Sequence, residues 1–349
     1  MSDGAAGNDK IRELHRMRLL GILSGAWTAQ ACYALAALRL PDRMKEAGPS
    51  SAADLARFAE VHPVSLERLL RALVSAGLLR NPSPDTFALT PMAEFLCSDT
   101  PDSARTTALL YGEEVHQSFG EILHTVRTGR PAFEERHGRP FYEYLDDHPD
   151  TADRFNAAMG GQQELPVVPD ALLDGVRTVV DIGGGNGALL GSVLAAHPDL
   201  TGVLLELPDA ARQARKHLAD AGLLERVRIV EGSFFDTVPA GGDLYLLSRV
   251  LHNWNDENAV RLLRHVRDTM PPDARLAVVE ALLPEPGTGG KRADEARTRM
   301  VDLLMLVMLE GHDRTGAQYE GLLTTAGFRV VGTTMTAGTG AIEAVRDAG

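Results

Sequence analysis

The sequence predicts an α/β protein with a doubly wound, mostly parallel sheet, preceded by an all-helical, winged-helix-like domain. From residue 178 onward, short runs of Val, Ile and Leu alternate with longer helix-like stretches, which is the pattern of strands joined by crossover helices. Before that point, leucines recur mainly at helical spacing. The chain has 349 residues, more than a single hydrophobic core usually supports, so we expect at least two domains.

A strand, a glycine turn and a helix at the start of this second half organise the rest of the chain. Residues 178–182 are mostly β-formers with Asp181 near the strand end, and Gly183, Gly185 and Gly187 alternate through the following turn. Glycines let a ligand lie against the backbone and the helix start, so this is the first unit of a nucleotide-binding sheet. Two other interpretations of this turn are open. It loosely fits a dinucleotide-binding fingerprint, which alone is weak evidence, or it is a glycine turn that binds no ligand.

The remaining elements of the second half follow from alternating patterns and breakers. We expect further strands at 202–206, 227–230, 243–247, 276–281, 330–335 and 341–345, and helices at 188–196, 208–221, 258–270, 300–309 and 318–326.

Polar residues gather at the carboxyl ends of these strands: Asp181, Glu206, Ser233, Ser248 and Glu280. Ligands of open α/β sheets bind in the crevice beyond those ends. Glu206 follows the glycine turn by about 20 residues, the distance at which a carboxylate reaches the ribose hydroxyls of a bound nucleotide. We therefore expect a nucleoside-containing ligand at this edge.

The N-terminal third is mostly helical. Residues 11–40 form a helix with apolar side chains on more than one face, which either a partner subunit or an intrachain core must cover, and Pro41 ends it. The pattern predicts two helices over residues 51–77, with an N-cap at Ser51. It also predicts short strands at 78–80 and 86–89, and this arrangement is similar to a winged helix. Residues 51–100 hold four arginines and six acidic residues, whereas DNA-binding modules are normally basic.

The stretch before the sheet is expected to be helical over 103–126, 141–145 and 152–159, with a loop on either side of Phe133 and a domain boundary near 165–175.

Composition narrows the classes of partner. The net charge is −13, with 35 basic and 48 acidic side chains, which argues against nucleic acid and against an anionic membrane surface. Cys32 and Cys97 are the only cysteines, so we expect no disulfide framework, no zinc site and a reducing cytoplasmic location. We also expect no signal peptide, no membrane-spanning segment and no bound divalent metal.

Four motifs occur in order, Val179-Val-Asp-Ile-Gly-Gly-Gly-Asn-Gly187, Gly232-Ser-Phe-Phe-Asp236, Ser248-Arg-Val-Leu-His-Asn-Trp-Asn-Asp256 and Gly311-His-Asp-Arg-Thr315. The first resembles motif I of class I methyltransferases, which bind S-adenosylmethionine. Together with Thr128-Gly-Arg-Pro-Ala-Phe133, Arg154-Phe-Asn-Ala-Ala-Met159 and Asp302-Leu-Leu-Met-Leu306, they make the chain similar to the caffeate/hydroxyindole-type small-molecule O-methyltransferases. The likeness covers nearly the whole length and is nearest to the bacterial natural-product branch.

The resemblance implies a class I methyltransferase fold, S-adenosyl-L-methionine as cofactor, a small aromatic substrate and a homodimer formed through the N-terminal domain. Residues 1–100 match the dimerisation domain, 101–170 a helical connector lining the pocket, and 171–349 the catalytic domain. His252 matches the general base, and Glu280 and Asp313 match the acids that orient it. The implied cofactor contacts are Arg154, Asp181, Gly183, Gly185, Glu206, Ser233, Phe234, Ser248 and Arg249.

A flat, adaptable substrate pocket is expected from a set of aromatic and methionine side chains, for which simple core packing is the alternative. The set comprises Phe155, Met159, Trp254, Met300, Met305 and Met308.

Two positions depart from the family pattern. Ser233 stands where many members have aspartate, and Asn253 follows the histidine where many have aspartate. Three functions stay open: O-methyl transfer; the same fold with C- or N-methyl transfer, decarboxylation or hydroxylation; and a non-enzymatic winged-helix regulator.

Overall fold

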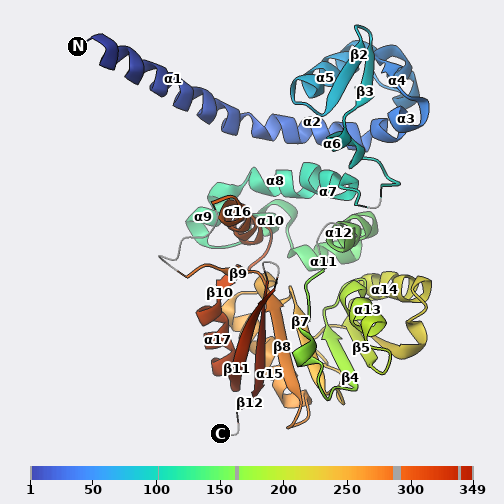
Figure 1. Ribbon diagram of the computed structural model, residues 1–349, viewed down its shortest axis with the longest axis vertical. Helices are drawn as coiled ribbons and strands as arrows, with labels where there is room; N and C mark the ends of the chain where they lie inside the picture. The colour runs from blue at the N-terminus through green and yellow to red at the C-terminus, as the bar shows by residue number, and fades with distance from the viewer. Residues whose placement is uncertain (1, 101, 162–164, 286–291, 337–338, 348–349) are drawn as a thin grey trace. The chain divides into compact units, whose positions relative to one another are not determined.

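The computed structural model describes residues 2–100, 102–161, 165–285, 292–336 and 339–347. The chain divides into two compact units, Met1–His116 and Gln117–Gly349 (Figure 1). The division into a dimerisation domain (1–100), a helical connector (101–170) and a catalytic domain (171–349) stays a prediction.

The first unit is a helical domain with a small antiparallel sheet. Its sheet has the order β1-β3-β2, and its core is built from leucines of α2 to α5 packed on Phe87. The helix pair and hairpin expected for a winged-helix-like domain are confirmed, as is the cap at Ser51, whose Oγ accepts from the Asp54 N–H at 3.1 Å. The elements are α1 Ser2–Leu23, α2 Gly25–Ala37, α3 Leu40–Ala47, β1 Ser50–Ser51, α4 Ala52–Ala59, α5 Pro63–Ser75, β2 Leu79–Ser83, β3 Thr86–Leu89, α6 Pro91–Glu94, α7 Arg105–Leu110 and a π-helical turn Tyr111–Val115.

The expectation of one helix over 11–40 that Pro41 ends was wrong: α1 and α2 are separate helices, and Pro41 lies in the first turn of a helix that was not predicted, α3. Proline is tolerated there since the first turn leaves its backbone N–H groups without intrahelical partners. The preceding helix has already ended at Ala37.

The expectation that no uncharged run approaches the roughly 18 residues of a membrane span was wrong, whereas the expectation of no membrane-spanning segment stays a prediction. Residues 19–38 carry no charged side chain, and the helical stretch Asp9–Ala37 is long and apolar enough to cross a membrane. Near its end Leu35 and Ala36 are buried in the core of the first unit. A single such helix near an N-terminus is weak evidence for a membrane span, because helices of soluble proteins also meet this test.

The second unit is a seven-stranded sheet with helices on both faces. The strand order is β11-β12-β8-β7-β4-β5-β6; the five strands from β8 to β6 are parallel, and β12 and β11 close the edge antiparallel. The predicted doubly wound, mostly parallel sheet is confirmed. The elements are α8 His116–Phe119, α9 Ile122–Thr128, α10 Ala132–His137, α11 Phe141–Asp147, α12 Pro149–Gly161, β4 Thr178–Ile182, α13 Ala188–Ala196, β5 Thr201–Glu206, α14 Pro208–Asp220, β6 Val227–Glu231, β7 Leu244–Ser248, α15 Asp256–Thr269, β8 Arg275–Glu280, β9 Leu282–Leu283, α16 Arg292–Met308, β10 Arg314–Thr315, α17 Gly316–Thr325, β11 Phe328–Thr336 and β12 Thr339–Arg346.

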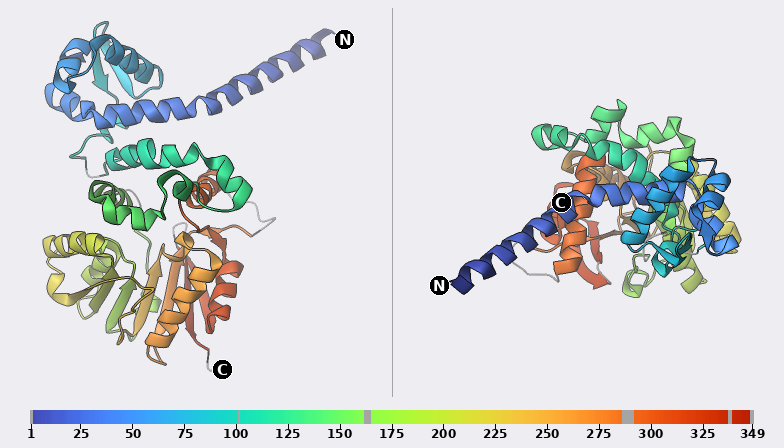
Figure 2. Two further views of the ribbon diagram at one scale, coloured as in Figure 1. Left: turned by 180° about the vertical axis from the view of Figure 1, so that it is seen from behind. Right: turned by 90° about the horizontal axis from the view of Figure 1, so that it is seen from above.

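Alternate residues of the central strand serve two separate cores. Val180 and Ile182 of β4 pack with α15 and α17, while Val179 packs with α13 and α14. The two helix layers are visible in Figure 1 and, from behind, in Figure 2. Because the chain proceeds from β4 to β5 and β6 on one side and to β7 and β8 on the other, the strand order reverses between β4 and β7, and we expect the ligand crevice of such sheets at their carboxyl ends.

The structure adds local elements to those expected. The segment that contains Phe133 is a short helix, α10, which was not predicted, and the loops expected on either side of it are residues 129–131 and 138–140. Pro131 precedes α10, and Gly138 ends it in the left-handed region at φ 79°. The two-residue strands β9 and β10, which pair in parallel, were not predicted.

We predict that Gly184→Ala destabilises the second unit. An alanine Cβ there would lie 2.3 Å from Asp181 Oδ2 and 2.5 Å from Leu204 Cδ1, and overpacking of this kind costs about 1–3 kcal/mol. Differential scanning calorimetry should record a midpoint lowered by about 5 °C. Gly321→Ala is the matched control, since that helical glycine has nothing within 4 Å of an added Cβ; equal midpoints for both variants would contradict the close approach at Gly184.

Candidate active site

The glycine turn after β4 brings bare backbone to the crevice. Gly183, Gly185 and Gly187 all have positive φ, at 69°, 58° and 75°, which L side chains rarely adopt. A Cβ on Gly183 would meet Val250 Cγ2 at 3.0 Å and Phe234 Cε1 at 3.4 Å, whereas nothing lies within 4 Å of one on Gly185. The turn therefore packs against the loops after β6 and β7 at one point and is open at the next.

Two carboxylates lie beside this turn. Glu206, at the end of β5, accepts the Gly185 N–H on Oε2 at 2.9 Å and the Leu207 N–H on Oε1 at 2.7 Å. Burial raises the pKa of Glu206, while these two backbone bonds act in the opposite direction. Asp181 is fully buried, and burial together with the charge of Glu206 raises its pKa to about 7.

Neither side-chain oxygen of Asp181 has a hydrogen-bond partner among the described residues. Buried carboxyl oxygens without donors are costly, so this edge suits a ligand that donates hydrogen bonds. A nucleoside with vicinal hydroxyls and amino groups has that chemistry, and the residues present fit such a group.

His252 lies on the other side of the crevice, in a 3-10 helix, Leu251–Asn253, that follows β7. Its Nδ1 lies 3.2 Å from Asp313 Oδ1 and 3.9 Å from Glu280 Oε2. A proton on Nδ1 satisfies Asp313 and leaves Nε2 as the basic nitrogen. The structure therefore brings together the three residues expected to carry the chemistry.

Both acids beside His252 are buried. Glu280 Oε1 accepts the N–H groups of Val250 and Leu251 at 3.0 and 2.9 Å, and burial raises the pKa of Glu280. Burial acts to lower the pKa of His252, but the carboxylates of Glu280 and Asp313 outweigh it, so the pKa of His252 is raised above its ordinary value.

Aromatic rings from three separate segments pack together near this edge of the sheet. The Trp254 ring stacks on Tyr142 with centroids 5.9 Å apart, and it meets Phe234 and Phe235 edge-on at 5.9 and 4.7 Å. Phe155 contacts the Tyr142 ring at 6.2 Å. Phe155 and Trp254, both expected in the substrate pocket, therefore meet through Tyr142, and Phe234, expected at the cofactor, adjoins Trp254. The pocket itself stays a prediction.

Tyr142 was missed by the sequence reasoning. It belongs to α11, and burial together with the negative charge of Glu206 raises its pKa above the ordinary range. Its neighbours Trp254 and Glu206 are both distant in sequence, so the only local signal was an aromatic residue within the loosely predicted helix 141–145.

The four methionines expected in the substrate pocket differ in how far their side chains are exposed. Met159 and Met300 are exposed, Met305 is half-buried, and Met308 is buried. Their assignment to a substrate pocket stays a prediction, with core packing the alternative for Met308.

The remaining expected cofactor residues have mostly local contacts. Ser233 Oγ accepts the Phe235 N–H at 3.2 Å, so the serine shapes its own loop. Ser248 is the last residue of β7. Arg249 has a positive φ of 55°, a strained conformation common at functional sites, and burial lowers its pKa. Arg154 donates to Thr151 Oγ1 at 3.0 Å within α12.

Asn253 has a contact that an aspartate cannot make. Its Nδ2 donates to the Arg249 carbonyl at 3.3 Å, and a carboxylate has no donor for that bond. The departure from the family pattern therefore stabilises the turn that carries His252.

No group of three or more His, Cys, Asp or Glu side chains suited to a metal occurs within the described parts of the chain. The expectation that no divalent metal binds stays a prediction.

Known proteins share both parts of this architecture. Residues 119–329 match the model of the O-methyltransferase domain and residues 20–99 that of the O-methyltransferase dimerisation domain. A phenazine O-methyltransferase of Lysobacter antibioticus is 37% identical over 89% of this chain and 90% of its own. The 8-amino-8-demethylriboflavin N,N-dimethyltransferase of Streptomyces davaonensis is 42% identical over 86% of each chain.

A solved structure extends the likeness to the fold. An O-methyltransferase from neocarzinostatin biosynthesis, in complex with S-adenosylmethionine and 2-hydroxy-5-methyl naphthoic acid, superposes with a TM-score of 0.80 at 32% identity, over 91% of this chain and 96% of that one. With the family model spanning more than half of the sequence and the sheet order and carboxyl-edge site described above, this chain belongs to the O-methyltransferase family.

Proposed function

We propose that this protein transfers a methyl group from S-adenosylmethionine to a phenolic hydroxyl of an aromatic natural-product intermediate, with His252 as the general base. The observation that carries the proposal is the His252 imidazole, held through Nδ1 by Asp313 at 3.2 Å with Glu280 behind it. This arrangement is that of a base whose second nitrogen is free to receive a proton.

The energetics explain why two acids accompany the base. A phenol has a pKa of about 10 and a histidine about 6.5, so full proton transfer costs about 5 kcal/mol. The carboxylates of Glu280 and Asp313 raise the pKa of His252 and so narrow this gap. They also stabilise the imidazolium that forms as the acceptor oxygen attacks, which lowers the cost further.

The donor side is assigned to the glycine turn and its acids. S-adenosylmethionine supplies an electrophilic methyl group on a positively charged sulfur when bound. Glu206 would accept hydrogen bonds from vicinal ribose hydroxyls, and Gly183 would let the ligand approach the backbone. Asp181 would contribute a buried carboxyl group beside the ligand, and Gly185 would contribute open backbone. The remaining contacts to S-adenosylmethionine are assigned to Arg154, Ser233, Phe234, Ser248 and Arg249.

The aromatic cluster supplies the acceptor side. Tyr142, Phe155 and Trp254 present flat apolar surface and exclude water from the reacting oxygen, which strengthens the charge interactions around His252. A flat aromatic acceptor matches such a surface.

Nitrogen is the second candidate acceptor atom, because the relative from Streptomyces davaonensis, at 42% identity, is named an N,N-dimethyltransferase. The buried base favours oxygen, since an aromatic amine attacks through its lone pair without first losing a proton. Mass spectrometry and NMR of the product distinguish O-, N- and C-methylation, and also decarboxylation or hydroxylation.

We also propose a cytoplasmic homodimer that binds neither nucleic acid nor a membrane. The acidic net charge of −13 and the two free cysteines, Cys32 and Cys97, support the location and the absence of those partners.

We predict that wild-type protein methylates at least one member of a panel of phenolic intermediates and that His252→Ala lowers kcat by about 10²- to 10⁴-fold. The Kd for S-adenosylmethionine, measured by calorimetry, should stay within about two-fold, because the variant leaves the glycine turn and Glu206 intact. The exposed His217 of α14 provides the control, His217→Ala. Unchanged turnover in His252→Ala would remove the assignment of the base.

We predict that the acidic limb of the pH profile of kcat/KM lies above pH 6.5 and moves to lower pH in Asp313→Asn. The base must be neutral to accept a proton, and a raised pKa keeps it protonated to higher pH; activity is therefore lost as pH falls through that raised value. Removing the Asp313 charge lowers the pKa of His252 and shifts the limb downward. A limb that does not move in the variant would show that another group titrates.

We predict that the N-terminal helices mediate dimerisation. Leu23 and Trp27 are 64% and 76% exposed within the chain, and a partner copy would bury such side chains. Light scattering after size exclusion should give twice 37.6 kDa for the wild type and a monomer for Leu23→Glu/Trp27→Glu. Val64→Glu, also at an exposed apolar position, is the control; a double variant that stays dimeric would place the interface elsewhere.

A further inference from the structure

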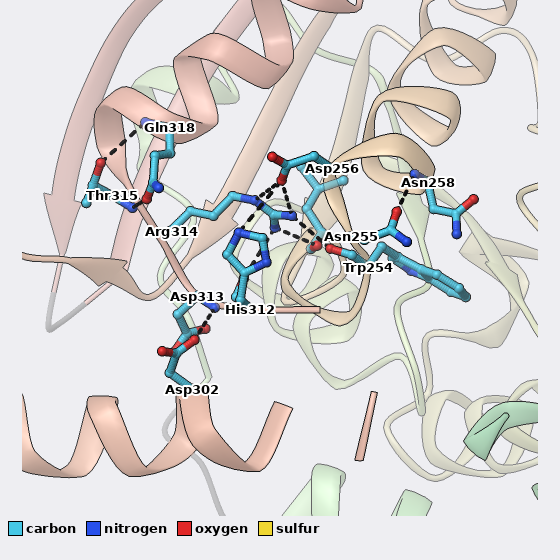
Figure 3. Close-up of polar contacts among 11 residues, drawn as sticks. Trp254, Asn255, Asp256, Asn258, Asp302, His312, Asp313, Arg314, Thr315 and Gln318 are labelled. Atoms are coloured by element: carbon cyan, nitrogen blue, oxygen red, sulfur yellow. Dashed lines mark hydrogen bonds and ion pairs between the residues drawn. The ribbon is translucent and has the colours of Figure 1, made fainter. Parts of the chain in front are cut away.

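Arg314 is a buried arginine between the two loops that carry the proposed catalytic residues. Its side chain is almost fully buried. The guanidinium donates to the Trp254 carbonyl at 2.8 Å and to Asp256 Oδ1 at 3.0 and 2.7 Å (Figure 3). It also donates to the Leu251 carbonyl at 3.1 Å. A further bond reaches the His312 carbonyl at 3.3 Å.

These acceptors enclose His252 in sequence. Leu251 precedes the histidine directly, and Trp254 follows it after one intervening residue, while Arg314 itself follows Asp313. The planar, permanently charged guanidinium of Arg314 therefore binds the backbone on both sides of His252. Because Arg314 follows Asp313 in the chain, it links that backbone to the loop that carries the hydrogen-bond partner of His252. Guanidinium groups suit this role because their donors are held in a rigid fork.

The loop on the Arg314 side is anchored separately. The Asp313 N–H donates to Asp302 Oδ1 of α16 at 3.0 Å, and Arg314 pairs in parallel with Leu282, two residues beyond Glu280. Thr315 then caps α17 in a reciprocal capping box with Gln318. The loop is thus fixed to three elements, and Arg314 transmits that position to the histidine loop.

A close backbone contact supports the same link. A Cβ on Gly311 would lie 2.0 Å from the His252 carbonyl oxygen and 2.6 Å from the Trp254 nitrogen. The two loops therefore touch through their main chains, and small displacements of one are felt by the other.

We propose that Arg314 is a positioning residue for proton transfer, which sets the distance between His252 and Asp313 by clamping the carbonyls of Leu251 and Trp254. The inference rests on the proposed role of His252 as the base. The hydrogen bonds of Arg314 go to backbone carbonyls and to Asp256 rather than to the imidazole, so in this proposal it acts through the loop.

Replacement by lysine tests the clamp. A lysine keeps the charge but offers one nitrogen, which cannot span the two carbonyls and Asp256 together. The charged groups facing His252 are Glu280 from β8, Asp313 before β10 and Arg249 from its own segment. Of these, Asp313 adjoins position 314, so loosening the clamp separates His252 from the acid that raises its proton affinity.

The experiment is an NMR titration of the His252 imidazole in the full-length protein, assigned by comparison with His252→Ala. We expect Arg314→Lys to lower the His252 titration midpoint by about one unit and kcat by about 10- to 100-fold, with the Kd for S-adenosylmethionine unchanged. Asp313→Asn should have the same direction, and the double variant should add little to either single one.

Arg226→Lys is the matched control. The Arg226 guanidinium also donates to backbone carbonyls, those of Leu194, His197 and Leu200. These carbonyls lie at the end of α13 and in the connection to β5, not in the loop of His252. A merely structural role for Arg314 would lower the melting temperature in both variants and leave the His252 midpoint and kcat of Arg314→Lys at wild-type values, which would overturn the proposal.

Two further measures keep the outcome interpretable. If Arg314→Lys does not fold, Asp256→Asn weakens the same clamp from an exposed carboxylate and should shift the midpoint in the same direction; no shift overturns the proposal. The titration needs no methyl acceptor, so a wild type without transferase activity would contradict the proposed function while leaving the test of Arg314 valid.

Discussion

The contact between His252 Nδ1 and Asp313 Oδ1 is the interaction on which the catalytic region depends. The two residues lie 61 positions apart in sequence and meet only because β10 pairs beside β9. The contact is made where charges are costly, since Glu280 Oε2 and Asp313 Oδ2 are buried without a hydrogen-bond partner among the described residues. Buried acids without hydrogen-bond partners persist only when the surrounding sheet and helices hold them in place.

The same sheet edge contains a second pair of acids in different surroundings. The buried Asp181 and the half-buried Glu206 lie beside the glycine turn, and the pKa of Asp181 is raised to about 7 by burial and by the charge of Glu206. A cationic ligand near this pair would favour its ionised form. In the proposed function this pair belongs to the side of the methyl donor, and Glu280 and Asp313 belong to the side of the base.

The sequence analysis succeeded where a signal is local and failed where it is not. The strand and glycine turn at 178–187 carry their pattern in consecutive residues and were located correctly. The motif around His252 is also written in consecutive residues, and the role of this histidine stays a prediction. The strands β9 and β10 have two residues each, too few for any periodicity, and α10 is a short helix between Pro131 and Gly138. Tyr142 and Arg314 escaped notice because their contacts reach distant segments, as Arg314 does to Trp254.

The short helix around His252 explains why an arginine is needed beside it. The 3-10 helix Leu251–Asn253 has only three residues, and within it the Leu251 carbonyl accepts the Trp254 N–H. Arg314 donates a second hydrogen bond to the Leu251 carbonyl and one to the carbonyl of Trp254, the residue that follows the helix. Asp256, at the first turn of α15, balances the charge of Arg314. A longer regular helix would satisfy its own carbonyls but would fix the histidine by its own geometry. The short helix instead takes the position of His252 from Asp313 and Arg314, so the geometry of the base is set across the fold.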